Sequence, residues 1–180
     1  MILETSRLIL RPWDETDAES LFEYAKSPLI GPAAGWPAHA SLETSLQLIR
    51  KVLSADEIYA VTIKNENKAI GCIGLLIGNQ SNFNIKEHEA EIGYWIGVPY
   101  WGQGLIPEAM HELMRYAFDE LSITTIWCGY FDGNEKSKRV QEKCGFRFHY
   151  TEEKYWVPTN ETKTVHITRI SKKEWQNINF

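Results

Sequence analysis

Two glycines lie where a predicted strand passes into a predicted helix, and their spacing suits the binding of a phosphate group. The segment Tyr94–Ala109 reads YWIGVPYWGQGLIPEA, with the loop Gly102-Gln103-Gly104 and a helix that we expect to open at Pro107. Because glycine has no Cβ atom, backbone N–H groups can converge on a ligand, and a helix start adds unpaired donors and a positive dipole end. These features predict a pyrophosphate cradle, although an ordinary glycine-rich turn has the same local pattern.

Length and composition indicate one globular domain. The chain has 180 residues, of which 43% are hydrophobic and 24% charged, so we expect a single domain over 1–180 with its core over about 7–172. The formal net charge of −5 and the absence of a Lys/Arg run disfavour a nucleic-acid partner and are compatible with an amine-bearing substrate. The longest strongly apolar run, 69–78, is too short to span a bilayer, and the N-terminus lacks a signal-peptide pattern. We therefore expect a cytoplasmic protein with no membrane partner.

The three cysteines do not form a metal-binding or disulfide pattern. Cys72, Cys128 and Cys144 are scattered through apolar stretches, with no CxxC or Cys/His ligand spacing. We expect buried thiols, no metal site and no cysteine nucleophile. The sequence also lacks GxSxG and HExxH motifs, and its glycine loop has no Walker lysine.

Periodicity and capping residues predict a mixed α/β fold in the order β-α-α-β-β-β-α-β-α-β-β. Asp14, Ser41 and Asn134 are placed to cap helices, and Gly145 is placed to end one. The predicted helices cover 15–27, 41–54, 107–121 and 135–144, and the predicted strands 7–11, 58–63, 69–77, 88–98, 124–131, 146–157 and 163–170. This order predicts a mixed sheet with helices on both faces, whose two later strand–helix units can face one crevice.

An irregular segment separates the first two predicted helices. Residues 28–40 contain three prolines and two glycines, so we expect no regular element there. The segment carries Trp36 and His39, which could line the entrance to a substrate site. For His39 alone, a structural role is the alternative.

Four stretches, in order along the chain, resemble a known family. They read ETSRLILRPW, GWPAH, EIGYWIGVPYWGQGLIPEA and NEKSKRVQEKCGF. With them the chain resembles the GNAT-superfamily N-acetyltransferases, and in particular the RimJ/RimL type that acetylates the N-termini of ribosomal proteins. The resemblance implies one GNAT-like domain with a central mixed, twisted sheet of about six to seven strands. It also implies acetyl-CoA as acetyl donor and direct transfer to a primary amine in a ternary complex.

The resemblance places the cofactor on the glycine loop and on the strand before it. The implied pyrophosphate loop is Trp101, Gly102, Gln103, Gly104, Leu105 and Ile106. Ile106 departs from the Gly or Ala that the superfamily usually has there, but the expected contacts are backbone ones. A backbone N–H of Tyr94, Trp95 or Ile96 is expected to bind the thioester oxygen as negative charge develops, and the sequence does not choose among the three.

The same resemblance implies two residues for proton transfer. An amine must lose a proton before it attacks a thioester, and a carboxylate acting through water can accept that proton. Glu91 is the first candidate base and Glu89 the reserve; a solvated strand carboxylate is the alternative for Glu91. Many members have a tyrosine where this chain has Gln141, so Ser137 becomes the candidate proton donor to the leaving thiolate. Asn134 is expected to contact the pantetheine arm as well as to cap its helix.

The acceptor is the least determined part of the prediction. The resemblance favours a protein N-terminus, while a small amine such as an amino acid, a polyamine or an antibiotic is a second possibility. Two other classes are a non-catalytic acyl-CoA-binding module and a protein that uses the loop for another nucleotide. The protein is expected to be a monomer or a homodimer, and Trp36 and His39 are the candidate acceptor-binding residues.

Overall fold

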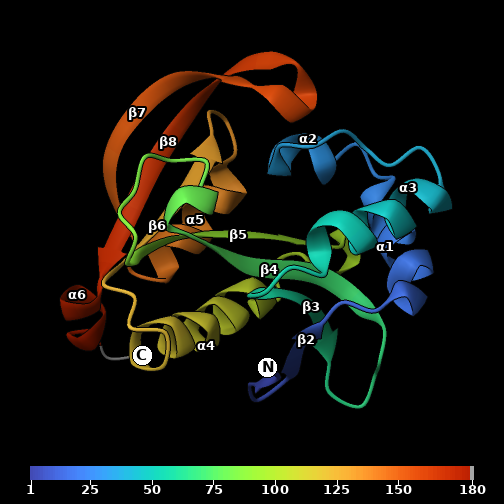
Figure 1. Cartoon of the computed structure of the whole chain (residues 1–180), viewed down its shortest axis with the longest axis horizontal. Helices are drawn as coiled ribbons and strands as arrows, with labels where there is room; N and C mark the ends of the chain where they lie inside the picture. Colours follow the sequence, from blue (N-terminus) through green and yellow to red (C-terminus); the bar gives the residue numbers. More distant parts are fainter. Residues whose placement is uncertain (179–180) are drawn as a thin grey trace. The chain divides into compact units, whose positions relative to one another are not determined.

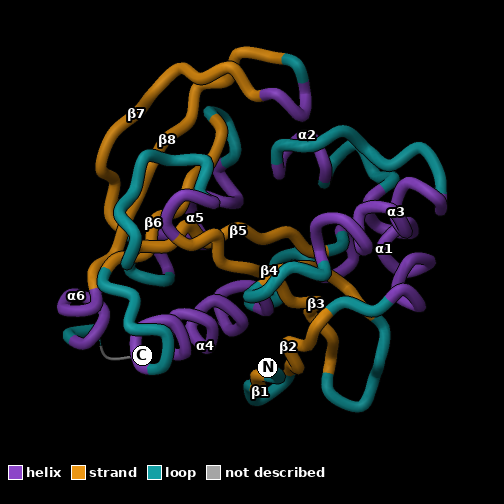
Figure 2. Tube along the Cα trace, in the orientation of Figure 1, coloured by secondary structure: helices purple, strands orange, loops and turns teal. Residues whose placement is uncertain are grey.

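The computed structural model describes residues 1–178, which fall into two compact units that alternate along the chain. Unit 1 consists of Met1–Gly74 and Tyr94–Ala109, and unit 2 of Leu75–Gly93 and the chain from Met110 onward. Within the described residues, eight strands form one mixed sheet in the order β1-β2-β3-β4-β5-β6-β8-β7. Figures 1 and 2 show the course of the chain through these elements. The prediction of a single domain over the whole chain stays a prediction.

Unit 1 is built on an antiparallel meander that ends in β4. Strand β1 pairs with β2, β2 with β3 and β3 with β4, and a register shift lies in β3 between Val61 and Thr62. The elements that begin in this unit are β1 (Leu3–Glu4), β2 (Leu8–Pro12), α1 (Ala18–Ala25), α2 (Gly31–Ala34), α3 (Leu42–Leu48), β3 (Ile58–Ile63), β4 (Ala69–Ile77) and α4 (Leu105–Asp119).

In unit 2, one parallel strand pair joins an antiparallel pair of long strands. Strand β5 is parallel to β6, while β6–β8 and β8–β7 are antiparallel. Figure 1 shows β7 and β8 as a long, curved ribbon in orange and red. The bounds are β5 (Glu89–Ile96), β6 (Thr125–Phe131), α5 (Glu135–Lys143), β7 (Arg147–Trp156), β8 (Glu161–Ser171) and α6 (Lys172–Gln176).

The capping residues identified in the sequence begin and end the helices as expected. Asp14 caps a short 3-10 turn that leads into α1, and Asp17 completes a capping box with it. The side chains of Ser41 and Asn134 accept from backbone N–H groups at the starts of α3 and α5. Gly145 follows α5 with a φ of +84°, the left-handed conformation that favours glycine.

Each unit has its own buried apolar cluster. In unit 1, α1 and the π-helical turn Ile49–Leu53 that follows α3 pack on β3 and β4, through the buried residues Trp13, Ala18, Leu21, Ala25, Ile49, Leu53, Ala60, Ala69 and Cys72. In unit 2, Phe83 from the loop before β5 packs on Trp127, Val165 and Ile167. One face of α4 is also buried, through Met110, Leu113, Met114, Ala117 and Phe118.

The structure corrects four details of the predicted elements. The sheet has one strand more than the six to seven expected, because the two-residue β1 is too short to show periodicity. The segment expected to have no regular element contains α2, a single turn with Pro32 in its first positions, where a missing N–H costs nothing. Helix α4 begins at Leu105 rather than Pro107, and α6 extends the chain beyond the last predicted strand.

Candidate functional site

The glycine loop lies between β5 and α4 and has the conformation that the sequence predicts. A short 3-10 turn, Val98–Tyr100, leads into it, and Gly102 and Gly104 have φ values of +76° and +72°. Within residues 1–178, the backbone N–H groups of Gly102, Gln103 and Gly104 donate to no acceptor. The loop is also exposed at these three residues. It therefore presents consecutive free donors at the start of a 15-residue helix.

Side chains on either side of the loop hold its shape. The indole N–H of Trp101 donates to the carbonyl of Ile96 at 3.0 Å, and the amide of Gln103 donates to the carbonyl of Pro99 at 3.0 Å. Ile106, the residue that departs from the family pattern, is buried with 5% of its surface exposed. Its side chain points into the core, so it does not cover the donors of the loop.

Glu108 in the first turn of α4 fastens the N-terminal segment to the loop. Its carboxylate accepts from Thr5 Oγ1 at 2.5 Å, from Ser6 Oγ at 3.0 Å and from the backbone N–H and Nε of Arg7 at 2.8 and 2.6 Å. Burial raises the pKa of Glu108, but these hydrogen bonds outweigh it and lower the pKa to about 2. The carboxylate is therefore ionised at neutral pH.

Arg7 lies at the glycine loop itself. Its Nη1 donates to the carbonyl of Gln103 at 3.0 Å, and its Nη2 would lie 3.7 Å from a Cβ atom built on Gly104. About half of the side chain, 49%, is exposed. Arg7 thus places a guanidinium beside the free N–H groups. In the sequence, Arg7 is only the first residue of a predicted strand. No pattern among its neighbours links it to a loop about a hundred positions further along the chain.

Strand β5 comes very close to β4 within unit 1. The N–H of Gly97 donates to the carbonyl of Ile70 at 2.8 Å, and a Cβ atom built on Gly71 would lie 2.5 Å from the carbonyl oxygen of Trp95. A side chain at position 71 would therefore displace the backbone of β5. A glycine inside a strand commonly marks such a close approach of two backbones.

In unit 2 the parallel pairing of β5 with β6 stops early. It covers Glu89–Glu91 and Thr125–Trp127, although the two strands continue to Ile96 and Phe131. The next carbonyl of β5, at Ile92, accepts from the thiol of Cys128 at 3.3 Å. Within the described chain, the ladder hydrogen bonds between these two strands are therefore confined to their first residues.

Glu91 is buried and fully engaged with the loop before β5. One carboxylate oxygen accepts from Ser81 Oγ at 2.7 Å and from the backbone N–H of Asn82 at 2.6 Å. The other oxygen accepts from Asn82 Nδ2 at 3.1 Å, and the residue is 8% exposed. This excludes the solvated strand carboxylate that the sequence left as the alternative for Glu91. The reserve candidate, Glu89, is also buried and accepts from the indole N–H of Trp127 at 2.9 Å.

Asn134, Ser137 and Gln141 are brought together at the start of α5. Asn134 Oδ1 accepts from the N–H of Ser137 at 3.1 Å, and Ser137 Oγ lies 3.1 Å from Gln141 Nε2, which donates to it. Gln141 is completely buried and also binds the carbonyl of Gly129 and the hydroxyl of Thr168.

Trp36 and His39 lie together, beside a residue of β5. Their ring centroids are 5.2 Å apart, and Trp36 is 6.0 Å from Trp95 in an edge-to-face arrangement. Trp13 lies 6.4 Å from Trp95 on another side, so three indoles gather here. His39 is buried, and its Nδ1 is 2.7 Å from Ser45 Oγ. Burial lowers the pKa of His39, so the imidazole is neutral at pH 7.

The predicted site residues divide between the two units. Unit 1 holds Trp36 and His39 together with Tyr94–Ile96 and Trp101–Ile106, and unit 2 holds Glu91, Asn134 and Ser137. The sequence missed Arg7, Glu108 and Trp13, whose importance depends on contacts between distant segments. An acidic residue in the first turn of a helix was the available signal for Glu108.

Among the described residues no metal-ligating cluster is found, and the cysteine thiols are buried. Residues 1–178 contain no group of three or more His, Cys, Asp or Glu side chains placed to hold a metal ion. Burial raises the pKa of all three thiols, to about 12 for Cys72 and Cys144. Their reactive thiolate forms are therefore scarce at neutral pH. None of the described helices is both long and apolar enough to cross a membrane.

Comparison with known proteins connects this geometry to one family. The family model described as an acetyltransferase (GNAT) domain matches residues 7–147. The N-acetyltransferase YoaA of Bacillus subtilis (strain 168), itself called uncharacterized, is 29% identical over 151 residues, which cover 81% of this chain and 82% of the relative. YdaF of the same organism, named as a proposed ribosomal N-acetyltransferase, is 41% identical over 75 residues, or 41% of each chain. The crystal structure of a GNAT-family acetyltransferase from Bacillus anthracis superposes with a TM-score of 0.83 at 24% identity, covering 96% of this chain and 99% of that one.

Proposed function

The chain belongs to the acetyltransferase (GNAT) domain family, and from this premise we propose that it acetylates the α-amine of a protein N-terminus of the ribosomal-protein type. Members of the family are N-acetyltransferases that take the acetyl group from acetyl-CoA. The finer assignment to RimJ/RimL-like enzymes is supported by the four sequence stretches. It is also supported by the 75 residues over which this chain is 41% identical to YdaF. The cytoplasm is the proposed compartment, and three buried cysteines that form no disulfide agree with it.

The glycine loop is the observation that carries the proposal. Free N–H groups at Gly102, Gln103 and Gly104 and a helix start at Leu105 form a compact set of donors, and Arg7 supports the loop through the carbonyl of Gln103. Such a set fits the pyrophosphate of acetyl-CoA, which has two adjacent negative groups. The residues present therefore fit the cofactor without the lysine cluster that the sequence lacks.

The remaining cofactor contacts are proposed along β5 and at the start of α5. Because the pairing of β5 with β6 stops at Glu91, backbone groups of β5 are left to bind a pantetheine arm as an added strand would. A backbone N–H among Tyr94, Trp95 and Ile96 then stabilises the thioester oxygen. One such donor typically contributes about 2.7–4 kcal/mol to barrier lowering. Asn134 is proposed to contact the same arm.

Two side chains are proposed to move protons. When bound, acetyl-CoA supplies an activated acyl group, to which the amine nitrogen forms a bond while the carbon–sulfur bond breaks. Glu91 accepts the amine proton through a water molecule, and Ser137 donates its proton to the departing thiolate. The donors Ser81 and Asn82 hold the Glu91 carboxylate in one orientation, which a positioned base requires.

The acceptor is proposed to bind near Trp36 and His39. The neutral imidazole of His39, held by Ser45, and the edge-to-face indoles of Trp36 and Trp95 make a surface with little charge. Such a surface suits the side chain of an N-terminal residue and does not repel its ammonium group. A polyamine or aminoglycoside, with several positive charges, would find no acidic cluster among these residues.

An acceptor screen that measures CoA release tests the proposal. We expect turnover with short peptides that present a free α-amine and none with the same peptides blocked at that amine. Turnover only with free amino acids, polyamines or antibiotics would move the activity to small amines. Calorimetry with acetyl-CoA provides a separate check, and no binding at submillimolar concentration would refute the cofactor site. Binding without turnover on any acceptor would favour a non-catalytic acyl-CoA-binding module.

A further inference from the structure

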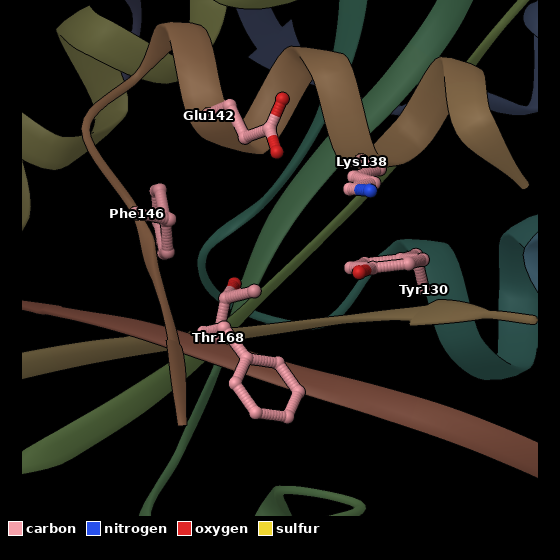
Figure 3. A pocket seen from close by; sticks show the side chains of 6 residues that line it. Tyr130, Lys138, Glu142, Phe146 and Thr168 are labelled. Atoms are coloured by element: carbon pink, nitrogen blue, oxygen red, sulfur yellow. The ribbon is translucent and has the colours of Figure 1, made fainter. Parts of the chain in front are cut away.

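A pocket of about 270 Å³ lies in unit 2 and is distinct from the residues assigned to acetyl transfer. Its lining comes from α5, from β6 and β8, and from the start of β7 with the residue before it (Figure 3): Tyr130, Lys138, Glu142, Phe146, Phe148 and Thr168. Drug-sized ligands occupy cavities of roughly 300 Å³ and more. This pocket is therefore of the size for a small metabolite.

One wall of the pocket carries two opposite charges that do not pair. Lys138 and Glu142 are four residues apart on α5, a spacing that brings side chains together on one face of a helix. In the part of the chain that the structure describes, Glu142 has no ion pair within 4.0 Å, and Lys138 has only Glu135 at 3.9 Å. The order Lys before Glu is also the less favourable one for pairing within a helix. Both groups are thus available to a ligand; Figure 3 shows their side chains on α5.

The opposite wall offers a hydroxyl and two phenyl rings. The side-chain hydroxyl of Tyr130 has no hydrogen-bond partner among the described residues, and burial raises its pKa, so it is a donor at neutral pH. Phe146 is buried, while Phe148 is 64% exposed, which is unusual for so large an apolar side chain. The Thr168 hydroxyl is not available in the same way, because it donates to Gln141 at 2.7 Å.

From this arrangement we propose that the pocket binds an α-amino acid in its zwitterionic form, with an apolar side chain. Glu142 receives the ammonium group, Lys138 and Tyr130 receive the carboxylate, and Phe146 and Phe148 contact the side chain. A simple anion would be repelled by Glu142 and a simple cation by Lys138, whereas a zwitterion satisfies both at once. The proposal does not depend on the acetyl acceptor, because no residue of the pocket has a role in the transfer.

The test uses L-phenylalanine as probe, with the full-length protein and no acetyl-CoA. A ligand of a dozen heavy atoms is expected to bind with a Kd on the order of 1 mM, which NMR titration can measure. L-Phenylalaninamide lacks the carboxylate, and N-acetyl-L-phenylalanine lacks the ammonium group. We expect each analogue to bind at least about tenfold more weakly than the parent amino acid, since each loses a charge-assisted contact.

Matched variants connect each loss to one residue. Lys138→Met should weaken the binding of L-phenylalanine about tenfold and abolish the preference for L-phenylalanine over L-phenylalaninamide. Glu142→Gln should weaken the binding of L-phenylalanine by the same factor and abolish the preference for it over N-acetyl-L-phenylalanine. Arg139→Met on α5 and Glu153→Gln on β7 change the same charges outside the pocket and should leave the Kd within about twofold. Thermal unfolding of each variant shows that it is folded. No binding at about 10 mM, or binding that neither pocket variant alters, would overturn the proposal.

Discussion

Replacing Glu108 by Gln should destabilise the protein in a way that depends on pH. The carboxylate accepts from Thr5, Ser6 and Arg7, which together lower its pKa from an ordinary value of 4.5 to about 2. The difference of about 2.5 corresponds, at about 1.4 kcal/mol per pKa unit, to about 3.4 kcal/mol. The Glu108 side chain is 17% exposed, so solvent screens part of this stabilisation. We therefore expect the substitution to lower the free energy of unfolding by about 2–3 kcal/mol at pH 7.

The direction of the pH dependence follows from the sign of the pKa change. Since the folded protein holds Glu108 at a lower pKa than the unfolded chain does, the unfolded chain binds more protons between about pH 4.5 and 2. The stabilisation is therefore complete above about pH 5 and is lost as the pH falls toward 2. At pH 3 the difference between wild type and Glu108→Gln should be less than half of its value at pH 7.

Urea denaturation followed by tryptophan fluorescence between pH 2.5 and 8 measures this difference. Glu4→Gln is the matched control, because Glu4 is 62% exposed and, within residues 1–178, its one ion pair is with Lys64 at 3.3 Å. We expect that control to change the free energy of unfolding by less than about 0.5 kcal/mol at any pH. A loss for Glu108→Gln that is equally large at pH 3 and pH 7, or that is as small as in the control, would refute the reasoning.

Three other substitutions test the site and its support. Gly104→Ala places a side chain at a φ of +72°, which should cost about 1–2 kcal/mol of stability and weaken acetyl-CoA binding, measured by calorimetry, at least about tenfold. The control is Gly133→Ala, at a φ of +82° and with no atom within 4 Å of the added Cβ, which should show only the stability cost. Glu91→Gln should lower kcat by about 100-fold or more with the Kd for acetyl-CoA nearly unchanged, and a loss that only mirrors a lower Tm would indicate that Glu91 merely anchors its loop. Gln141→Leu removes the partners of buried groups at Gly129 and Thr168 and should cost about 2–4 kcal/mol of unfolding free energy; a change below about 0.5 kcal/mol would contradict that role.

Features that depend on neighbouring residues could be predicted from the sequence. The helix starts at Ser41 and Asn134, the left-handed stop at Gly145 and the bends at Gly102 and Gly104 are each decided within a few positions. The sequence therefore located the loop and the helix that follows it. Element ends were less accurate: α4 begins two residues before Pro107, because a proline is tolerated throughout the first turn, where N–H groups have no partner.

The contacts that position the residues of the candidate site join segments far apart in the sequence. Patterns among neighbouring residues do not predict such contacts. Glu108 and Arg7 are 101 positions apart, and Trp13 meets Trp95 across a similar separation. The donors to Glu91 come from a polar loop whose sequence gave no reason to prefer Ser81 or Asn82 over their neighbours. Only the arrangement of the chain in space turns Glu91 from one strand carboxylate among several into a buried, oriented group.

The pairing of Arg7 with Glu108 has a consequence for how the loop attracts a phosphate group. A carboxylate in the first turn of a helix would normally compete with a bound anion for the same N–H groups. Here Glu108 turns instead to the N-terminal segment, and its charge is balanced by Arg7 at 2.6 Å. The pair adds almost no net charge, so the attraction for an anion must come from the free N–H groups of the glycines and from the helix end. A protein with net charge −5 can bind a highly anionic cofactor in this way, because the donors act at hydrogen-bond distance while the overall charge is screened by salt.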